Sequence, residues 1–431
     1  MENSVLKQAL GLHQSVIENV RVEANSIVIS ARPRKKALRC PVCKKRCDAY
    51  DTLPARRWRT LDIGGSRCYI EYAPRRVECA DHGVRSEALP WARSAKSRFT
   101  SAFEDLVAWL SLDMCRSALS ELMRVSWRSV GSICKRVADD LEEQDGHDRF
   151  SDLRAIGIDE TSYKKGYKYI TVIVDHDKGR IVWATKGYGK RQLNDFFDLL
   201  TDKQRSSIKV VTADGARWIA ETVAERLPGA ELAVDPFHVV SWATDALDEL
   251  RRKAWQDARK TPPKKRHPGR PKKGEKETKD PAKEVKGLRY PLLKNPENLS
   301  DKQACALDAL KKSGGLLWRG YLLKEGLRAV FKAGEGASEA LDRWLSWACR
   351  CRIPSFVELS RKIRKKKDAI LRSVELGVSN ARVEAVNNKI KIAIRQGYGF
   401  RNVDNLIALV MLRCSDLKPK LPGREDVLLP T

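Results

Sequence analysis

The chain has 431 residues and a formal net charge of +27, with 83 Lys and Arg against 56 Asp and Glu. An excess of this size needs polyanions nearby to be tolerated, so nucleic acid is the leading partner. No run of about 18 apolar residues is present, and the N-terminal MENSVLKQALGLHQ lacks the charged and apolar regions of a signal peptide. We therefore expect a soluble protein that is not exported and has no membrane partner.

Residues 39–90 predict a small β module held together by metal. Short β-like runs, RCYIEY and RRVECA, alternate with Gly and Pro turns, and the stretch holds five of the eleven cysteines. Cysteines clustered in this way are typical of metal-binding thiols in a reducing compartment, so no disulfide is expected. Cys47 and Cys68 are competing ligands, and free buried thiols are the alternative interpretation. One C-x2-C pair and one C-x2-H pair supply four ligands for one structural Zn²⁺ with no open position: Cys40, Cys43, Cys79 and His82.

From Ser94 the apolar spacing becomes helical, first in FTSAFEDLVAWLSLDMC and then in RSALSELMRVSWRSVGSICKRVADDLEEQ. Two short helices are expected to meet near residues 125–126, which fits a helix-turn-helix. Residues 127–137 then enter a major groove, with Arg128 and Lys135 at phosphates or bases. A plain helical hairpin explains the apolar pattern equally well, but the basic faces favour DNA binding.

From residue 153 the apolar period is that of strands. Strands in LRAIGIDE, YKYITVIVDHD and RIVWATKG precede the first helix, and the full order is β-β-β-α-β-α-β-α. Asp159 ends one strand and Asp214 ends another. Ligand groups gather at the carboxyl ends of strands in an α/β sheet, so the two carboxylates are expected to meet there. An Asp that closes a strand is, however, more often a turn or cap residue.

One acidic residue lies in a basic helix predicted over residues 378–402. A carboxylate facing phosphates repels them by roughly 1 kcal/mol per close pair in water, so Glu384 is placed there either by chance or for metal binding. In phosphoryl transfer, clustered carboxylates hold two divalent ions about 4 Å apart, and oxygen ligation favours Mg²⁺ or Mn²⁺. The cations that surround Glu384 are Arg382, Lys389, Lys391, Arg395 and Arg401.

Two other carboxylates compete for a place in this site. Glu160 follows Asp159 directly, so in a strand its side chain points to the opposite face. Asp175 is predicted to lie in a hairpin turn. The residue chemistry alone therefore indicates metal-dependent phosphoryl transfer on nucleic acid by Asp159, Asp214 and Glu384.

The chain contains, in this order, the segments GIDE, TADG, DPFHVV and SNARVEAVNNKIKIAIRQGYGFRN. With these segments it resembles insertion-sequence transposases of the ISL-three family over nearly its whole length. The last segment is the most specific, because Glu384, Asn387, Asn388, Lys389 and GYGF match together. The resemblance implies an RNase H-like catalytic domain with an Asp-Asp-Glu triad. By that match the triad is Asp159, Asp214 and Glu384.

The resemblance also implies several accessory features. The 169 residues between Asp214 and Glu384 imply a helical insertion inside the catalytic domain. Asp235 and His238 in DPFH resemble a signature of related transposases that serves DNA positioning or leaving-group chemistry, although they are also typical of a strand end and a helix start. The family usually presents a second C-x2-C pair, so His82 is a departure that zinc chemistry accepts.

The Pro-rich basic stretch at residues 259–298 is too polar to bury a core and is expected to be a mobile loop. HPGRPKK around Arg270 is similar to a hook that enters the minor groove of A·T-rich DNA. A nuclear-import signal looks similar, and an unspecific electrostatic arm is the favoured interpretation.

Together these features predict an α/β multidomain enzyme of the bacterial cytoplasm, associated with the nucleoid. The resemblance implies that it binds the terminal inverted repeats of an insertion sequence, cleaves them and joins them to target DNA. The alternatives are a structure-specific RNase H-like nuclease and a zinc-finger DNA-binding regulator with an inactive catalytic fold. The expected parts are a zinc module (1–93), a helix-turn-helix (94–150), the catalytic domain (151–245), a helical insertion (246–376), the last catalytic helix (377–416) and a tail (417–431).

Joining two element ends brings two DNA substrates together, so a homodimer or larger assembly is expected on DNA. The insertion is expected to contact flanking nucleotides through Trp344 and Trp347. Alternatively these tryptophans are core residues of the helices, Trp347 more so than Trp344.

Overall fold

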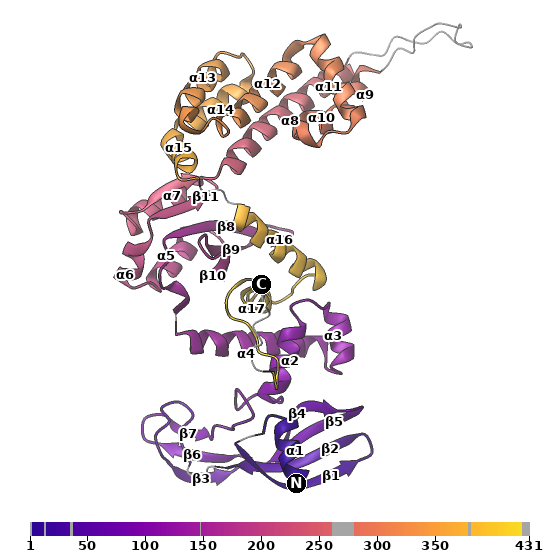
Figure 1. Cartoon of the computed structure of the whole chain (residues 1–431), viewed down its shortest axis with the longest axis vertical. Helices are drawn as coiled ribbons and strands as arrows, with labels where there is room; N and C mark the ends of the chain where they lie inside the picture. Colours follow the sequence, from indigo (N-terminus) through magenta and orange to yellow (C-terminus); the bar gives the residue numbers. More distant parts are fainter. Residues whose placement is uncertain are drawn as a thin grey trace, which may run out of the picture.

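The protein, described here by a computed structural model, is elongated, with its parts following one another along one axis (Figure 1). The structure describes residues 2–12, 14–34, 38–146, 148–260, 280–377 and 381–424. The N-terminal β sheets lie at one end and the helical insertion at the other, with the α/β part between them. Among the described helices, none has the length and apolar character needed to span a membrane.

The N-terminal part contains helix α1 (Glu2–Ala9) and two sheets. The core of the larger sheet includes Trp58 and Trp91, whose rings meet edge to face with centroids 5.9 Å apart. The strands predicted in RCYIEY and RRVECA are confirmed as β5 and β6. The four-stranded sheet has the order β1 (Ser15–Glu23), β2 (Ser26–Pro33), β5 (Ser66–Tyr72), β4 (Arg56–Ile63), and the three-stranded sheet has the order β3 (Asp48–Thr52), β6 (Arg75–Cys79), β7 (Gly83–Ser86).

A layer of three helices follows: α2 (Ser101–Leu110), α3 (Arg116–Leu122) and α4 (Trp127–Asp145). The side chain of Ser126 accepts a hydrogen bond from the backbone of Ser129 and so caps α4, which confirms the predicted junction between two helices. The second helix is not short, however, because it runs for 19 residues. Its apolar stripe packs against α2 on one side and against the late helix α17 (Val403–Cys414) on the other.

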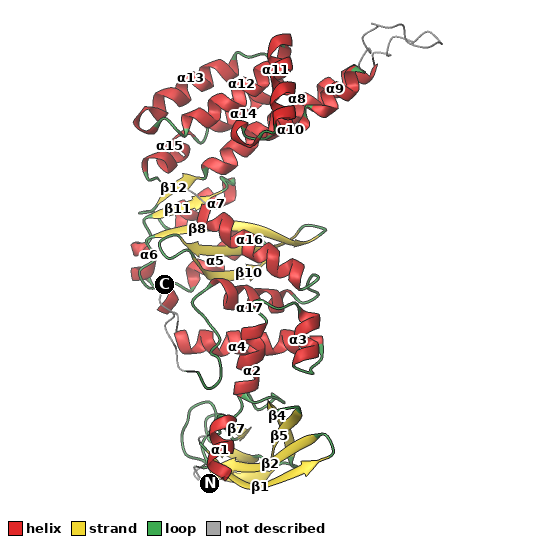
Figure 2. Cartoon of the chain, turned by 45° about the vertical axis from the view of Figure 1, so that its right-hand side comes forward, coloured by secondary structure: helices red, strands yellow, loops and turns green. Residues whose placement is uncertain are grey.

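The α/β part holds a five-stranded sheet of order β10-β9-β8-β11-β12 (Figure 2). Strands β8, β9 and β10 are antiparallel, whereas β11 runs parallel to both β8 and β12. Helices α5 and α7 cover one face, and α16 and α17 cover the other. The elements follow the predicted order except that a second, short helix, α6, follows α5: β8 (Ala155–Lys164), β9 (Lys168–Asp175), β10 (Arg180–Lys186), α5 (Lys190–Asp198), α6 (Asp202–Ser207), β11 (Val210–Ala213), α7 (Arg217–Arg226), β12 (Glu231–Val234) and α8 (Pro236–Lys260).

Helix α8 continues out of the α/β part into a helical domain with a core of its own. The chain returns to the sheet as α16 (Ala381–Gln396), which packs on β8. The remaining helices are α9 (Pro281–Gly287), α10 (Arg289–Leu293), α11 (Asp301–Ser313), α12 (Gly315–Val330), α13 (Ala337–Cys349), α14 (Pro354–Arg364) and α15 (Lys367–Glu375).

The prediction of a mobile loop over residues 259–298 is wrong for its ends. Residues 259–260 belong to α8, and residues 280–293 include α9 and α10. Leu292 is fully buried, and Lys324 Nζ donates to the carbonyl oxygens of Leu292 at 2.9 Å and Lys294 at 3.1 Å. A few apolar side chains anchor this segment despite its polar composition. Arg270 lies outside the described residues.

Two further expectations are corrected. The chain after α16 does not continue as one helix, because Tyr398 and Gly399 have φ values of 50° and 87° and end it before α17 begins. Trp344 is a core residue, 3% exposed, whose Nε1 donates to the carbonyl oxygen of Leu323 at 2.8 Å. It is therefore not available for DNA, whereas Trp347 is 41% exposed. The expected order of burial of the two tryptophans is thus reversed.

The close contact of α4 with α17 gives a first prediction. A Cβ at Gly131 would clash with the side-chain amide of Asn405, so we expect Gly131→Leu to lower the free energy of unfolding by about 1–3 kcal/mol. Urea unfolding followed by circular dichroism measures this change. Gly287→Leu is the matched control, because a Cβ at this helical glycine meets open space. Equal stability of the two variants would contradict the packing of α4 on α17.

Candidate active site and metal centre

Three acidic residues lie on neighbouring parallel strands of the sheet, two of them just beyond the carboxyl ends of their strands and one in the middle of a longer strand. Asp159 is in β8, Asp214 follows β11 and Asp235 follows β12. The registers of β11 with β8 and β12 place these ends along one edge of the sheet. The prediction that Asp159 ends a strand is wrong, because β8 continues to Lys164. The parallel register of β11 with β8 nevertheless places Asp159 near the level at which β11 ends, close to Asp214.

Asp159 is held by both its own strand and helix α16. The backbone N–H of Glu160 donates to Asp159 Oδ1 at 2.7 Å, and Asn387 Nδ2 donates to Asp159 Oδ2. Thr161 Oγ1 in turn donates to Asn387 Oδ1 at 2.6 Å. Burial raises the pKa of Asp159, and the hydrogen bonds from Glu160 and Asn387 act in the opposite direction. Asn387 therefore fixes the orientation of this carboxylate.

The start of α16 is seated closely on the sheet. A Cβ at Gly157 would clash with Val383 Cγ2 and come within 2.9 Å of His176 Nε2, so only glycine allows this approach. Arg382 Nη1 donates to the carbonyl oxygens of His176 and Asp177, which lie in the turn after β9. The first turn of α16 is thus fixed beside Asp159.

Glu384 lies in that first turn, three residues before Asn387, so the two side chains share a helix face. Its side chain is exposed. Across the described ranges, the only group of three or more Cys, His, Asp or Glu ligand atoms within 4.8 Å of one another is the cysteine and histidine group described below. Glu384 therefore lies on the helix that contacts Asp159, but the carboxylates of Asp159, Asp214 and Glu384 do not all lie within 4.8 Å of one another.

Asp214 links the sheet to the helical domain. Its Oδ1 accepts a hydrogen bond from the backbone of Ala216 at 2.8 Å, just before α7. Next to it, Lys362 Nζ lies 3.5 Å from the centre of the Trp242 ring. Burial lowers the pKa of Lys362, and the negative charge of Asp214 opposes this shift. Neither Lys362 nor Trp242 was predicted, because periodicity does not show which face of an inserted helix meets the sheet.

Glu160 is a fourth carboxylate of this region. Strand alternation does turn it away from Asp159, toward the face on which Ile156 and Ile158 pack. Burial raises its pKa to about 7, and Asp214 and Asp159 add to the shift. In the part of the chain that the structure describes, its buried Oε1 has no hydrogen-bond partner. Strand alternation therefore predicted correctly the face to which Glu160 points, but it did not predict that Glu160 lies close to Asp214.

The DPFH residues follow β12, and His238 is close enough to Asp159 to affect its pKa. Asp235 is 4% exposed, and its Oδ1 accepts a hydrogen bond from the backbone of Phe237 at 3.1 Å. His238 Nε2 is 3.9 Å from Asp235 Oδ2, and His238 acts electrostatically to lower the pKa of Asp159. The helix-start interpretation is correct for the backbone, and the imidazole also faces the carboxylate region.

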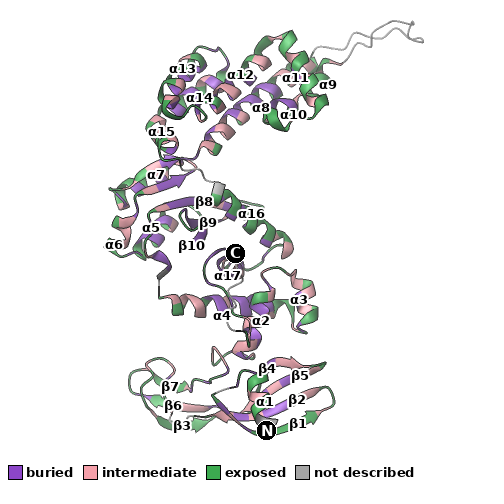
Figure 3. Ribbon diagram, in the orientation of Figure 1, coloured by how far each residue is buried: buried purple, intermediate pink, exposed green. Residues whose placement is uncertain are grey.

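The predicted DNA-binding residues occupy different surroundings. The predicted residues of α16 lie on the exposed surface of the helix (Figure 3). Arg128 is exposed in the first turn of α4, whereas Lys135 Nζ pairs with Asp139 Oδ2 at 2.7 Å, so its charge is locally compensated. The exposed α16 residues are Asn388, Lys389, Lys391 and Arg395.

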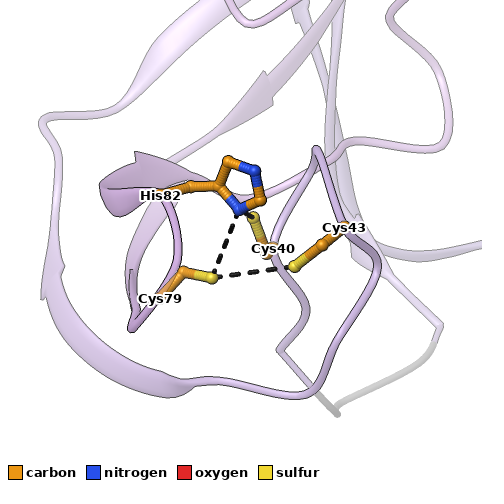
Figure 4. Close-up of side chains that lie close together, drawn as sticks. All are labelled: Cys40, Cys43, Cys79 and His82. Atoms are coloured by element: carbon orange, nitrogen blue, oxygen red, sulfur yellow. Dashed lines mark hydrogen bonds between the residues drawn. The ribbon is translucent and has the colours of Figure 1, made fainter.

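The four predicted zinc ligands converge from the segment before β3 and from the turn that joins β6 to β7 (Figure 4). The distance is 3.7 Å from Cys43 Sγ to Cys79 Sγ and 3.6 Å from Cys79 Sγ to His82 Nδ1. Cys40 Sγ lies 3.8 Å from the same nitrogen. Tetrahedral zinc with bonds of about 2.3 Å to sulfur spaces its ligand atoms by roughly 3.5–3.8 Å. These residues therefore fit a structural zinc.

The other two cysteines of this part are not ligands in this arrangement. Cys68 is fully buried in β5, within the larger sheet. Cys47 is near Cys79 but does not belong to the group of four ligand atoms. The hydrogen bond from His82 lowers the pKa of Cys79 to about 6, which favours the thiolate that binds metal.

Comparisons with known proteins agree with this arrangement. A model described as the zinc-finger of transposase IS204/IS1001/IS1096/IS1165 matches residues 36–82, which include all four ligands. The helix-turn-helix domain of transposase family ISL3 matches residues 87–138, and a model described as transposase matches residues 156–410. The chain belongs to the ISL3 transposase family.

Curated relatives of this transposase are named for the same activity. The transposase for insertion sequence element IS1557 of Mycobacterium tuberculosis is 45% identical over 430 residues, covering 96% of this chain and 95% of the relative. The transposase for insertion sequence element IS1001 of Bordetella parapertussis is 25% identical and covers 88% and 89%. The family resemblance, the zinc module and the helix-turn-helix are confirmed. The chain is a DNA transposase.

For the zinc centre of this transposase we expect one tightly bound zinc per chain. Cys43→Ser and His82→Ala should each lose it, because three ligands hold a structural zinc far less tightly than four. Cys47→Ser is the matched control and should retain the metal. Elemental analysis of protein purified without chelator measures the zinc content. Wild-type protein without zinc, or loss of zinc from Cys47→Ser alone, would contradict the assignment.

Proposed function

We propose that this transposase cleaves and joins DNA at an RNase H-like active site whose triad is Asp159, Asp214 and Glu384. The strand order β10-β9-β8-β11-β12, three antiparallel strands followed by two parallel ones, supports such a core. The observation that carries the proposal is the hydrogen bond from Asn387 to Asp159, because it brings the helix of Glu384 onto the strand of Asp159.

The carboxylates fit two Mg²⁺ or Mn²⁺ ions, which prefer oxygen ligands. When bound, such ions activate the attacking oxygen and stabilise the leaving oxygen of a phosphodiester. The protein supplies the positioning: Asn387 orients Asp159, and the first turn of α16 presents Glu384 on the same side. His238 lies beside Asp159, where it can bind a phosphate or donate a proton to a leaving oxygen.

DNA recognition is distributed along the molecule. The exposed cations of α16 bind phosphates next to the carboxylates, and the N-terminal turn of α4 presents Arg128 to the groove that a helix-turn-helix enters. In this first turn Trp127 and Arg128 are both exposed, and the buried stripe of α4 begins after them, at Val130. We infer that the zinc module and the helix-turn-helix bind the terminal inverted repeats while the α/β part acts on the strand.

The triad has a direct test. We expect Asp159→Ala, Asp214→Ala and Glu384→Ala each to lower strand cleavage and joining by at least ~10²–10³-fold. Each variant removes a carboxylate that holds a metal ion, and these ions stabilise the negative charge of the transition state. DNA affinity should stay the same or rise, since a repulsion of phosphate is removed. The assay uses purified protein, magnesium and labelled element ends, and it scores cut and joined products separately.

Asp202→Ala serves as the control in this assay, because the Asp202 side chain is 96% exposed and lies on α6, away from the triad. A triad variant with near-normal joining removes that residue from the site. Cut products without joined ones would instead support a structure-specific nuclease, and neither product would support a DNA-binding regulator.

We also propose that the active form on DNA is a dimer or a larger assembly, because strand joining brings two ends together. Light scattering of the protein on paired ends should give a mass of at least two chains per complex. The protein without DNA is the control. A single chain that cleaves and joins both ends would overturn this proposal.

A further inference from the structure

A cavity of about 820 Å³ lies between the helix-turn-helix and the α/β part. Four elements meet there: α3, the start of α4, the end of β8, and the loop that follows α16. Figures 1 and 2 both show α3 near the far end of α16. The volume is in the range of about 300–1,000 Å³ that is typical of ligand sites. The residues of its wall used below are Arg116, Trp127, Lys164, Tyr398, Phe400 and Arg401.

Tyr398 is presented to this cavity by a rigid turn. Its φ of 50° is left-handed, and its N–H donates to the carbonyl oxygen of Arg395 at 3.0 Å. A Cβ at Gly397 would come within 2.8 Å of the Phe400 ring, so the turn is closely packed underneath. Nevertheless Tyr398 is 85% exposed, and Trp127 in the same wall is 47% exposed. Two aromatic rings therefore face solvent from a fixed frame.

The charges of the cavity favour an anion. Arg116, Lys164 and Arg401 contribute three positive charges, and Glu121 contributes the only negative charge of the lining. Within the described residues, no ion pair involves any of the three cations. Arg116 instead lies over the Phe400 ring, 4.0 Å from its centre, and its burial lowers its pKa. Unpaired cations beside open aromatic rings are the combination that binds single-stranded nucleic acid.

We propose that this cavity holds an unpaired nucleotide of the DNA strand that is processed at the active site. Its base stacks on Tyr398, with Trp127 as a second ring, and its phosphates lie against Arg116, Lys164 and Arg401. The proposal rests on the proposed function, since it requires a DNA strand at Asp159 and Glu384. A base that enters the cavity leaves the duplex stack, which costs least near an end, a nick or a mismatch.

The position of the cavity sets the position of that nucleotide. Lys164 is five residues beyond Asp159 in β8, or about 17 Å along a strand. Gly397 follows Glu384 by thirteen residues, or about 20 Å along a helix. With roughly 3.4 Å per nucleotide along a DNA strand, the unpaired base lies about five to six nucleotides from the bond that is cleaved.

Binding measurements test the proposal. The probes are a fluorescein-labelled blunt duplex and the same duplex with a single-stranded tail of about six thymidines, each read by anisotropy without added magnesium. Tyr398→Asn is the test variant, because Asn tolerates a left-handed backbone. Tyr167→Asn is the matched control: Tyr167 is also 85% exposed, with a φ of 56°, but it does not line the cavity.

We expect Tyr398→Asn to weaken binding of the tailed duplex roughly tenfold, as loss of one stacked base does, with less than about a twofold change for the blunt duplex. Tyr167→Asn should match the wild type on both probes. A 2-aminopurine placed in the tail should be quenched by the wild type and by Tyr167→Asn, and should remain bright with Tyr398→Asn.

Equal losses on both probes would make Tyr398 a general DNA contact and overturn the proposal. No loss on either probe would overturn it too and leave the cavity to another kind of partner. Because no strand is cut in this experiment, its result does not depend on the triad. A failure here is thus distinguishable from a failure of the cleavage and joining assay.

Discussion

The contact between α16 and β8 is the constraint on which the proposed active site depends. Glu384 is 225 residues from Asp159 in the chain, and it comes near the sheet because Val383 packs on Gly157 while Asn387 binds Asp159. The packing sets the depth of the helix, and the hydrogen bond sets its rotation. A side chain at residue 157 would push α16 outward and carry both Asn387 and Glu384 away from the strand ends.

The helical domain is joined to this contact at both of its ends. It leaves the sheet through α8, directly after Asp235, and it returns through α15, which packs against β12. Lys362 and Trp242 lie close to Asp214, so residues of the insertion contribute to the electrostatic surroundings of the carboxylates. The insertion thus has a helical core of its own and also borders the proposed active site.

At the β10 edge of the sheet, α17 connects the α/β part to the helix-turn-helix. It packs on β10 and on α4, so the helix-turn-helix is fixed against the α/β part rather than suspended from a linker. The close approach at Gly131 shows how tightly these helices meet. In the proposed function, a connection of this kind sets the distance along DNA between the bases that α4 contacts and the bond that is cleaved near Asp159. The cavity lined by Tyr398 lies at this junction, where a strand passing from one part to the other would run.

The amino-acid sequence by itself determined the local features of this protein. Period and turn residues predicted the strands and helices from residue 153 to α8, because alternation and helical spacing are properties of neighbouring residues. The spacing of Cys40, Cys43, Cys79 and His82 predicted a zinc site, and the converging ligand atoms fit one. The resemblance of its motifs gave the transposase family. Composition alone was misleading where a few apolar side chains decide the outcome, as for Leu292 in a basic stretch.

Only the tertiary structure decided which distant side chains meet. Asn387 with Asp159, Lys362 with Trp242 and Glu160 with Asp214 are pairs whose proximity depends on how helices dock on the sheet, and no local period encodes that docking. The same holds for Trp344, which the fold buries, and for Tyr398, which it exposes on a rigid turn. Burial and close packing are sums over contacts from several elements, so they are settled when those elements come together.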